Sequence, residues 1–233
     1  MSGPAAYCEA IFELAEDEID TVRIRVAERL GVSRAAVSEM VQRLVEMELV
    51  RLEGTSIRLT GSGRELAEQS VRRHRLAERL LVDVLGLGWA EAHEIAGTWQ
   101  HVINDRTEAA IDRVLGSPTT CPHGNPIPGS TPDGARTAGL DPMAVGQMAV
   151  GSVGTVSRVT EQLEVQPGML ASLEHAGLVP GTRVEVLSIG HDGSLAVRAS
   201  RGVLALSSAT AARILVTPGD LGQISDAVAR GRH

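Results

Sequence analysis

The chain has 233 residues, 43% of them hydrophobic, which is enough for one large domain or for two to three small ones with a buried core. Its formal net charge of −7 excludes a general attraction to nucleic acid, so any contact with DNA must come from a local cationic patch. Only Cys8 and Cys121 are present, which excludes a disulfide framework and favours a reducing cytoplasm, and no apolar run is long enough to cross a bilayer, so no membrane partner is expected.

The first 60 residues are predicted to form a helix-turn-helix followed by a hairpin. Helices are expected over residues 5–16, 22–30 and 33–46. Asp20 or Thr21 can cap the second helix, Gly31 suits the left-handed residue at its end, and Ser33 is a good N-cap for the third. Two short strands then surround residues 53–55. A hairpin directly after the second helix of such a pair is typical of a winged helix.

The segment 72–105 is predicted to form two packed helices joined at Gly86–Gly88. Helical periodicity places two sets of side chains on facing surfaces: His74 and Glu78 on the first helix, and His93, Gly97 and His101 on the second. Imidazole and carboxylate groups that converge from packed helices can hold a first-row divalent metal. The alternative is structural, with hydrogen-bonded interface histidines and Glu78 paired to Arg75 or Arg79.

The composition changes after a further helix at 106–116. The stretch SPTTCPHGNPIPGSTPDGARTAG is rich in Pro, Gly, Ser and Thr and indicates a loop and linker. Its Cys121 and His123 are two possible soft ligands, but a zinc site needs four, so the segment is interpreted as a Pro-rich bracket that closes the helical domain. From about residue 141, short strands follow at the spacing of a small barrel, with one helical turn and a tight turn at Pro180–Gly181 between the first two.

The candidate DNA reader is the helix that begins at Ser33, because the N-terminal residues of the second helix of a helix-turn-helix meet base edges. Ala35 and Ala36 could touch thymine methyl groups, and Glu39 could accept only from a donor such as cytosine N4. A local excess of arginine suits phosphate contact. The candidate contacts are Arg23, Arg25, Ser33, Arg34, Ala35, Ala36, Ser38, Glu39 and Arg43. The alternative is that the arginines form surface ion pairs and the helix pair binds protein.

These motifs carry a resemblance that covers essentially the whole chain. In order they are VRIRVAERLGVSRAAVSEMVQRL, the hairpin, T-x-x-G-R with Thr60 and Arg64, HRLAERLL, H-x-x-A-x-x-W-x-H and GNPIPG. The sequence resembles the diphtheria toxin repressor (DtxR) family of iron- and manganese-dependent bacterial repressors. No nucleophile–base pair, phosphate loop or catalytic carboxylate pair occurs in it, so an enzyme is not expected.

The resemblance implies an α+β chain with five parts. They are a winged helix-turn-helix DNA-binding domain (1–66), a helical dimerisation and metal-binding domain (67–129), a linker (130–140), an SH3-like, FeoA-like small β-barrel (141–218) and a tail (219–233). It also implies a cytoplasmic homodimer with Fe(II) or Mn(II) as corepressor, and Zn(II), Co(II) or Ni(II) possible in vitro. Such a dimer represses metal-homeostasis genes from a palindromic operator in double-stranded DNA.

Only some of the family's metal-ligand positions hold a matching residue in this sequence. His74, Glu78 and His93 match the helical ligands of the family's ancillary site, to which the barrel of iron-type members adds two residues where this chain has Gln166 and Met169. At the primary site three ligand positions hold Ala6, Gly97 and Gln100. His101 remains, and Glu9 matches a carboxylate ligand of manganese-type members. The candidate ligands are His74, Glu78, His93, His101, Gln100, Glu9 and Gln166.

Two functional hypotheses follow from these departures, since engineered substitutions are not expected at positions scattered over two segments, and one of a different class follows from the barrel. The chain is a repressor that responds to metal through the retained site, or it has lost primary-site control and answers another signal or binds DNA constitutively. A third hypothesis is an interaction module whose barrel binds Pro-rich peptides or a partner protein. Glu39, which stands where iron-type members commonly have Gln, implies an altered base preference.

Overall fold

The computed structural model describes residues 3–130 and 141–219 and separates into two compact units. The first unit contains Met1–Pro122 and Pro126–Pro132, and the second contains His123–Asn125 and Asp133–His233. Helices and an antiparallel sheet are both present, which confirms the predicted α+β class. The expected linker and tail lie outside the described residues, apart from residues 130 and 219.

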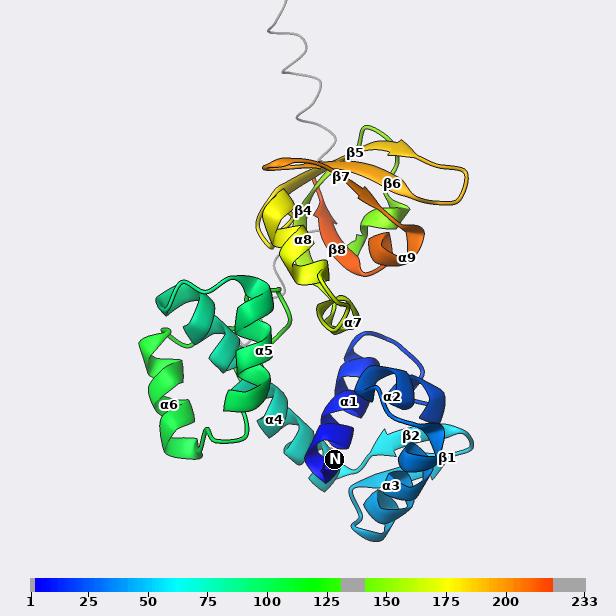
Figure 1. The fold of residues 1–233 in the computed structure, drawn as a ribbon, viewed down its shortest axis with the longest axis vertical. Coiled ribbons are helices and arrows are strands. Elements are labelled where there is room, and N and C mark those ends of the chain that lie inside the picture. Colours follow the sequence, from blue (N-terminus) through cyan, green and yellow to red (C-terminus); the bar gives the residue numbers. More distant parts are fainter. Residues whose placement is uncertain (1–2, 131–140, 220–233) are drawn as a thin grey trace, which may run out of the picture. The chain divides into compact units, whose positions relative to one another are not determined.

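The first unit begins with a winged helix (Figure 1). Its elements are α1 (Pro4–Glu16), α2 (Arg23–Leu30), α3 (Arg34–Glu46), β1 (Val50–Glu53) and β2 (Ser56–Leu59). Gly31 ends α2 in the left-handed conformation (φ 63°), and the Ser33 hydroxyl caps α3 by accepting from the Ala36 amide, so both predicted caps are confirmed. The predicted cap of α2 is wrong: Val22 is the N-cap, and the Thr21 hydroxyl instead donates to the Ile57 carbonyl at 2.7 Å.

Helix α4 (Gly61–Arg79) joins the winged helix to a second group of helices within the same unit. It continues into a π-helical turn, η1 (Leu80–Val84), and is followed by α5 (Trp89–Trp99) and α6 (Asp105–Val114). Ala67 of α4 packs in the core of the winged helix, whereas Leu76 and Leu81 pack in the core formed with α5 and α6. One continuous helix therefore contributes to both cores. The glycine joint between the long helices was predicted, but the π-helical turn was not.

Three arginines fix α4 to its neighbours. Arg75 is fully buried and holds the Glu16 carboxylate of α1 with a forked pair of hydrogen bonds of 2.6 and 3.0 Å. Arg72 and Arg73 pair at 2.6–3.0 Å with carboxylates of α6, namely Asp105, Glu108 and Asp112. Planar guanidinium groups in such pairs restrict both the distance and the orientation of the helices. The carbonyls of Pro126 and Pro128 accept from Arg75 and Arg72, so the Pro-rich segment does bind to α4.

The second unit is built on one antiparallel sheet of order β3-β8-β4-β5-β6-β7 (Figure 1). The strands are β3 (Met143–Ala144), β4 (Val153–Val159), β5 (Arg183–Ile189), β6 (Leu195–Ala199), β7 (Gly202–Leu206) and β8 (Ile214–Pro218). A 3-10 turn, η2 (Val145–Gln147), and short helices α7 (Glu161–Glu164), α8 (Met169–Ala176) and α9 (Ser208–Ala211) connect them. The predicted single helical turn in residues 166–181 is wrong, because α8 spans eight residues there, and the short helix α7 already precedes that span.

A buried polar network holds the segment His123–Asn125 in the second unit. The side chains of His123 and Glu164 are fully buried, with Nδ1 of His123 3.1 Å from the carboxylate. The Asn125 amide donates to that carboxylate and to the Val159 carbonyl. His123 therefore has a structural role here that the sequence pattern did not indicate. Within the described ranges, no helix combines the length and apolar character needed to span a membrane.

Helix α4 packs tightly at Gly63 against Leu49, the residue before β1, and this contact is testable. A Cβ atom at Gly63 would overlap the Leu49 carbonyl, whereas one at Gly61 meets nothing within 4 Å. We expect Gly63→Ala to lower the free energy of unfolding by about 1–3 kcal/mol, because the backbone must shift to relieve the overlap. Gly61→Ala, at the first position of the same helix, should cause no loss. Urea unfolding of both variants measures the difference, and equal stabilities would contradict the packing.

Candidate metal centre

Three side chains from α4 and α5 converge as predicted. The Glu78 Oε1 atom lies 3.1 Å from Nε2 of His74 and 2.8 Å from Nδ1 of His93, and the two ring nitrogens are 3.3 Å apart. The imidazole rings meet edge to face, with centroids 5.0 Å apart. Glu78 is fully buried and His74 is only 8% exposed. Two imidazoles and a carboxylate from facing helices thus share one small volume.

This group of atoms fits a divalent cation. Ligands bound at 2.0–2.2 Å in tetrahedral geometry are separated by roughly 3.4 Å, close to the 2.8–3.3 Å separations of these atoms. The Glu78 oxygen and the two nitrogens that face it can all act as electron-pair donors when the imidazoles are neutral. A first-row cation accepts such a mixed nitrogen and oxygen set. His74, Glu78 and His93 would hold the ion.

Gln100 fixes the tautomer of His74. The Gln100 amide nitrogen donates to both carboxylate oxygens of Glu9 on α1, at 3.1 and 3.3 Å. An ionised carboxylate only accepts, so the amide oxygen of Gln100 must be the atom that faces His74 Nδ1, at 2.7 Å. The Nδ1 atom of His74 therefore carries the proton, and the lone pair of Nε2 is directed at Glu78 and His93. Outer hydrogen bonds of this kind orient metal-binding histidines.

Glu9 and Gln100, both predicted as ligands, belong to this supporting chain of hydrogen bonds. The Glu9 carboxylate also accepts from the Ser70 hydroxyl of α4 at 2.8 Å. A cavity of about 210 Å³ adjoins these hydrogen-bonded side chains, and the small residues Ala6 and Gly97 are among those that line it. The residues at this position do not fit a second strong cation site, because Gln100 is a neutral amide whose oxygen is already engaged with His74.

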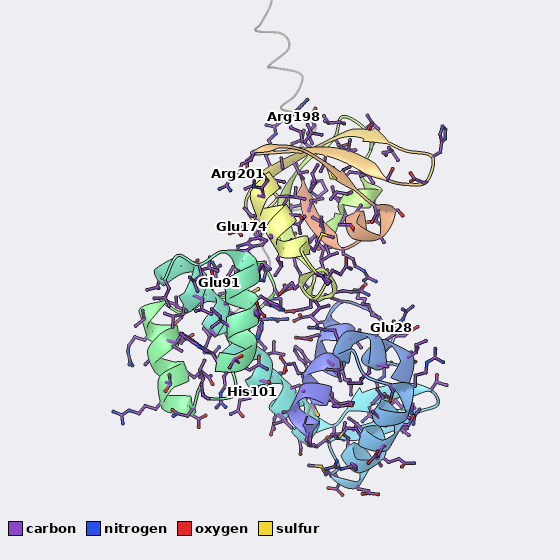
Figure 2. The ribbon with its side chains drawn as sticks, viewed as in Figure 1. Glu28, Glu91, His101, Glu174, Arg198 and Arg201 are labelled. Carbon is purple, nitrogen blue, oxygen red and sulfur yellow. The ribbon has the colours of Figure 1, made fainter. Side chains whose placement is uncertain are left out.

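The other two predicted ligands lie elsewhere. Helix α5 ends at Trp99, and His101 lies on the following turn, where it is exposed to solvent (Figure 2). The four-residue steps from His93 through Gly97 to His101 therefore fail to bring His101 to the ligand group, since α5 does not continue that far. Gln166 belongs to the second unit and is exposed after α7.

The predicted DNA-reading residues form an exposed surface on α2 and α3. Ser33, Arg34, Ala35, Glu39 and Arg43 are exposed, whereas Val37, Val41 and Leu44 on the opposite side of α3 are buried. Arg23, Ala36 and Ser38 are partly exposed, and the Ser38 hydroxyl donates to the Arg34 carbonyl at 3.0 Å. Arg25 is half-exposed and pairs with Glu28 at 2.8 Å. Such surface pairs contribute little energy and can be exchanged for phosphate.

Several residues that lie near the DNA-contact surface or fix α4 to α1 were not predicted from the sequence. Arg51 and Arg58 face each other across the hairpin and are both exposed. Pairing of the two strands could have indicated them, since the register follows from the two-residue turn. The partners of Ser70 and Arg75 were not predicted either. These partners lie on α1, about 60 residues away in the chain, and no local pattern predicts such pairs.

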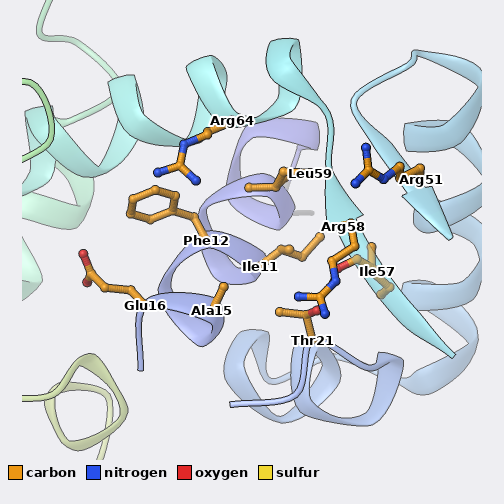
Figure 3. Close-up of a pocket in the computed structure, with 10 residues that line it drawn as sticks. All are labelled: Ile11, Phe12, Ala15, Glu16, Thr21, Arg51, Ile57, Arg58, Leu59 and Arg64. Atoms are coloured by element: carbon orange, nitrogen blue, oxygen red, sulfur yellow. The ribbon is translucent and has the colours of Figure 1, made fainter. Parts of the chain in front are cut away.

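A larger cavity, of about 410 Å³, lies beside the winged helix (Figure 3). Ile11, Phe12, Ile57 and Leu59 supply apolar lining, and arginines line it as well. Those arginines already have partners: Arg64 lies over the Phe12 ring and pairs with Glu68, while Arg51 and Arg58 pair with Glu53. The cavity therefore lacks the convergent ligand atoms of the His74, Glu78 and His93 group.

Three protein-family models match the chain. "Iron dependent repressor, N-terminal DNA binding domain" matches residues 5–56, "Iron dependent repressor, metal binding and dimerisation domain" matches 60–129, and "FeoA domain" matches 143–218. The iron-dependent repressor IdeR of Mycobacterium tuberculosis is 40% identical over 189 residues, which cover 77% of this chain and 81% of that protein. The diphtheria toxin repressor of Corynebacterium diphtheriae is 32% identical over 208 residues, which cover 80% and 88%.

Solved structures resemble the chain along most of its length. One described as a manganese-dependent transcriptional repressor complex with manganese has a TM-score of 0.77 at 33% identity, covering 93% of this chain and 100% of that one. The manganese regulator SloR has a TM-score of 0.72 at 27% identity, covering 94% and 100%. The match to the metal-binding and dimerisation domain includes His74, Glu78 and His93.

Replacement of Gln100 tests its role in positioning His74. In Gln100→Leu the His74 Nδ1 proton has no acceptor, so we expect Co(II) affinity measured by calorimetry to fall by about 10–100-fold. The ¹⁵N chemical shifts of His74 should also report loss of a single tautomer, which a general loss of packing would not produce. Gln69→Leu, at an exposed position of α4, is the matched control. An unchanged affinity in Gln100→Leu would show that Gln100 does not support the site.

Proposed function

The chain belongs to the diphtheria toxin repressor family of iron-dependent repressors, and we propose that it acts as a metal-dependent dimeric repressor. It binds a palindromic operator in double-stranded DNA and controls genes of metal homeostasis. The convergence of His74, Glu78 and His93 beside a winged helix carries this proposal. These side chains form a cation site on α4, the helix that also packs in the DNA-binding core.

His74 connects the metal centre to the winged helix. Its Nε2 faces the ligand group, and its Nδ1 proton is bound through Gln100 to Glu9 on α1. A bound cation would supply positive charge that offsets Glu78 and would polarise the His74 ring. The ring would then donate more strongly to Gln100, whose amide nitrogen donates to Glu9 on α1. This chain of hydrogen bonds favours one orientation of α2 and α3, and binding that favours one state shifts the population toward it.

Fe(II) or Mn(II) is the proposed cofactor. The relatives are named as iron-dependent and manganese-dependent repressors, and the two imidazoles and one carboxylate accept either ion. Zn(II), Co(II) and Ni(II) bind more tightly than Mn(II) or Fe(II) to most nitrogen and oxygen sites, so they can occupy this one in vitro. Metal availability, rather than affinity alone, would then decide which ion acts.

The exposed residues of α2 and α3 are the proposed DNA contacts. In a helix-turn-helix the start of the second helix enters the major groove, which assigns base contact to Arg34, Ala35 and Glu39. Glu39 accepts hydrogen bonds and does not donate, so it favours a base with an amino group in the groove. Arg51 and Arg58 of the hairpin add positive charge for neighbouring phosphates.

A homodimer accounts for exposed apolar side chains in the helical part of the first unit. Val84, Leu85, Val102 and Val114 are 53–75% exposed, and exposed aliphatic groups commonly mark a contact surface where they form one contiguous patch. They belong to the span matched by the dimerisation domain. Two-fold symmetry would present two copies of α3 to two half-sites about one helical turn, or a multiple of it, apart.

Metal control of DNA binding is the first test of this proposal. A DNA duplex selected from a random pool by the metal-loaded protein is titrated by fluorescence anisotropy with chelator, then with Fe(II), Mn(II), Co(II) or Zn(II). We expect metal to raise affinity by about 5–150-fold, the usual range of coupling between sites. His74→Ala combined with His93→Ala should abolish the increase. Equal affinity in every condition would instead support a family member that binds DNA constitutively or answers another signal.

The salt dependence of binding tests the proposed DNA surface. Arg58→Ala should lower the slope of log affinity against log salt by about 0.9 for each phosphate that the variant no longer neutralises, hence by about two in a symmetric dimer. The control is Arg106→Ala, an exposed arginine on α6. If the wild-type affinity barely changes with salt, phosphate contact is not the basis of binding, and an interaction module that binds protein becomes the better account.

A further inference from the structure

The cavity beside the winged helix combines an apolar lining with exposed arginines (Figure 3). It lies within the first unit, and its volume of about 410 Å³ is in the range of small-molecule sites. Ile11 and Ile57 are at most 1% exposed, while Phe12 and Leu59 are partly buried beside them. These side chains come from α1 and β2, and together they can shield an apolar group from water.

The arginines that line the cavity come from β1, β2 and α4. Arg51 and Arg58 are directly opposite each other in the register of the hairpin, and like charges at such positions destabilise a strand pair. Both pair with a single exposed carboxylate, that of Glu53, at 3.0 and 3.4 Å. Arg64 lies over the Phe12 ring, 5.6 Å from its centroid. One carboxylate therefore compensates two neighbouring cations of the hairpin, which leaves positive charge beside the apolar lining.

Acidic side chains near the cavity do not oppose the entry of an anion. Glu16 lines the cavity, but its carboxylate accepts two hydrogen bonds from the buried Arg75, at 2.6 and 3.0 Å, so its charge is compensated within the protein. Glu68 pairs with Arg64 at 2.7 Å, and both side chains are at least 36% exposed. Exposed pairs of this kind contribute little energy, so an entering carboxylate can replace Glu53 or Glu68 as the partner of an arginine.

We propose that this cavity binds a small organic monocarboxylate with an apolar body, such as an arylalkanoate. The carboxylate accepts hydrogen bonds from Arg51 and Arg58, because the planar guanidinium group matches the two carboxylate oxygens. The apolar body lies against Ile57, Leu59 and Phe12. An inorganic anion would leave this apolar lining unused, and a hydrocarbon would leave the arginines unused. The inference goes beyond metal-dependent repression, since none of the metal-ligand residues lines this cavity.

A carboxylate bound here would compete with DNA. Arg51 and Arg58 are the hairpin residues assigned above to phosphate contact, and a guanidinium group engaged with a carboxylate no longer neutralises a phosphate. This consequence, unlike the binding site itself, rests on the proposed function. The bound carboxylate is thus expected to lower affinity for DNA, which is the opposite of the effect expected of the metal.

The probe is 3-phenylpropanoate, titrated into the full chain without DNA and followed by calorimetry and by ¹H–¹⁵N NMR. Acetate retains the charge without the apolar body, and 3-phenylpropanamide retains the body without the charge. We expect 3-phenylpropanoate to bind with a dissociation constant of about 1 mM or lower, and the other two compounds to bind at least about tenfold more weakly. The largest shifts should be those of the Phe12, Ile57 and Leu59 amides.

Two variants and a matched control locate the binding site. Arg58→Gln removes one guanidinium group, whereas Ala15→Leu fills the cavity from an exposed position of α1 and leaves every arginine in place. Each should weaken binding of 3-phenylpropanoate by about threefold to tenfold. Arg113→Gln, at an exposed position of α6, should bind it as the wild type does. Urea unfolding checks that all three variants are folded.

Several results would overturn the binding site. One is the absence of 3-phenylpropanoate binding at about 1 mM. Another is an equal affinity for 3-phenylpropanamide, which would indicate an apolar cleft without preference for anions. Unchanged affinity in both Arg58→Gln and Ala15→Leu would place the ligand elsewhere in the molecule.

Competition with DNA is measured by anisotropy with the selected duplex and Co(II). Saturating 3-phenylpropanoate should lower DNA affinity by at least about fivefold relative to an equal concentration of acetate, which matches the ionic strength. Equal DNA affinity in the two solutions would overturn the competition. Failure of the chain to bind DNA in any condition would contradict the proposed function, whereas the calorimetric titration tests the carboxylate site without DNA.

Discussion

The contact on which the site depends is a buried carboxylate that faces two imidazole nitrogens from different helices. Glu78 is fully buried, and burial of an ionised carboxylate is unfavourable unless charge or hydrogen bonds compensate it. The ring of His93 can compensate by donating a hydrogen bond to Glu78, as can His74 when both of its ring nitrogens carry protons, or all three side chains can ligate a cation. Because both arrangements use the same atoms, the site is suited to respond to metal while the two helices stay packed.

The surrounding polar contacts connect the Glu78 site to the rest of the first unit, so that a change from hydrogen bonding to cation binding at Glu78 can affect the other helices. Helix α4 packs in two cores, is held to α1 by Arg75 and is held to α6 by Arg72 and Arg73. The path from His74 through Gln100 to Glu9 reaches α1 by hydrogen bonds. Stiff helices and directional pairs of this kind transmit small displacements, since packed cores have few intermediate arrangements. The proposed coupling therefore needs no large movement at the ion.

Much of the fold and part of the site could be predicted from the sequence, for identifiable reasons. His74, Glu78 and His93 were found because regular helices convert spacing into facing positions. The same rule failed at His101, because α5 ends two residues earlier. The role of Gln100 and the proximity of Cys121 to Glu78 depend on loop geometry and on hydrogen bonds between distant segments, and no periodic pattern encodes these. The prediction that Thr21 caps α2 was wrong because its hydroxyl donates a hydrogen bond to the Ile57 carbonyl, which is distant in the sequence.

The most direct test of the central claim is the metal affinity of the protein with and without its DNA. Coupling between two binding sites is reciprocal, so DNA must strengthen metal binding by the same factor by which metal strengthens DNA binding. We expect the dissociation constant for Co(II), measured by competition with a chelator, to fall by about 5–150-fold when the selected duplex is saturating. The same dissociation constant in free and DNA-bound protein would contradict the account, however tightly either ligand binds.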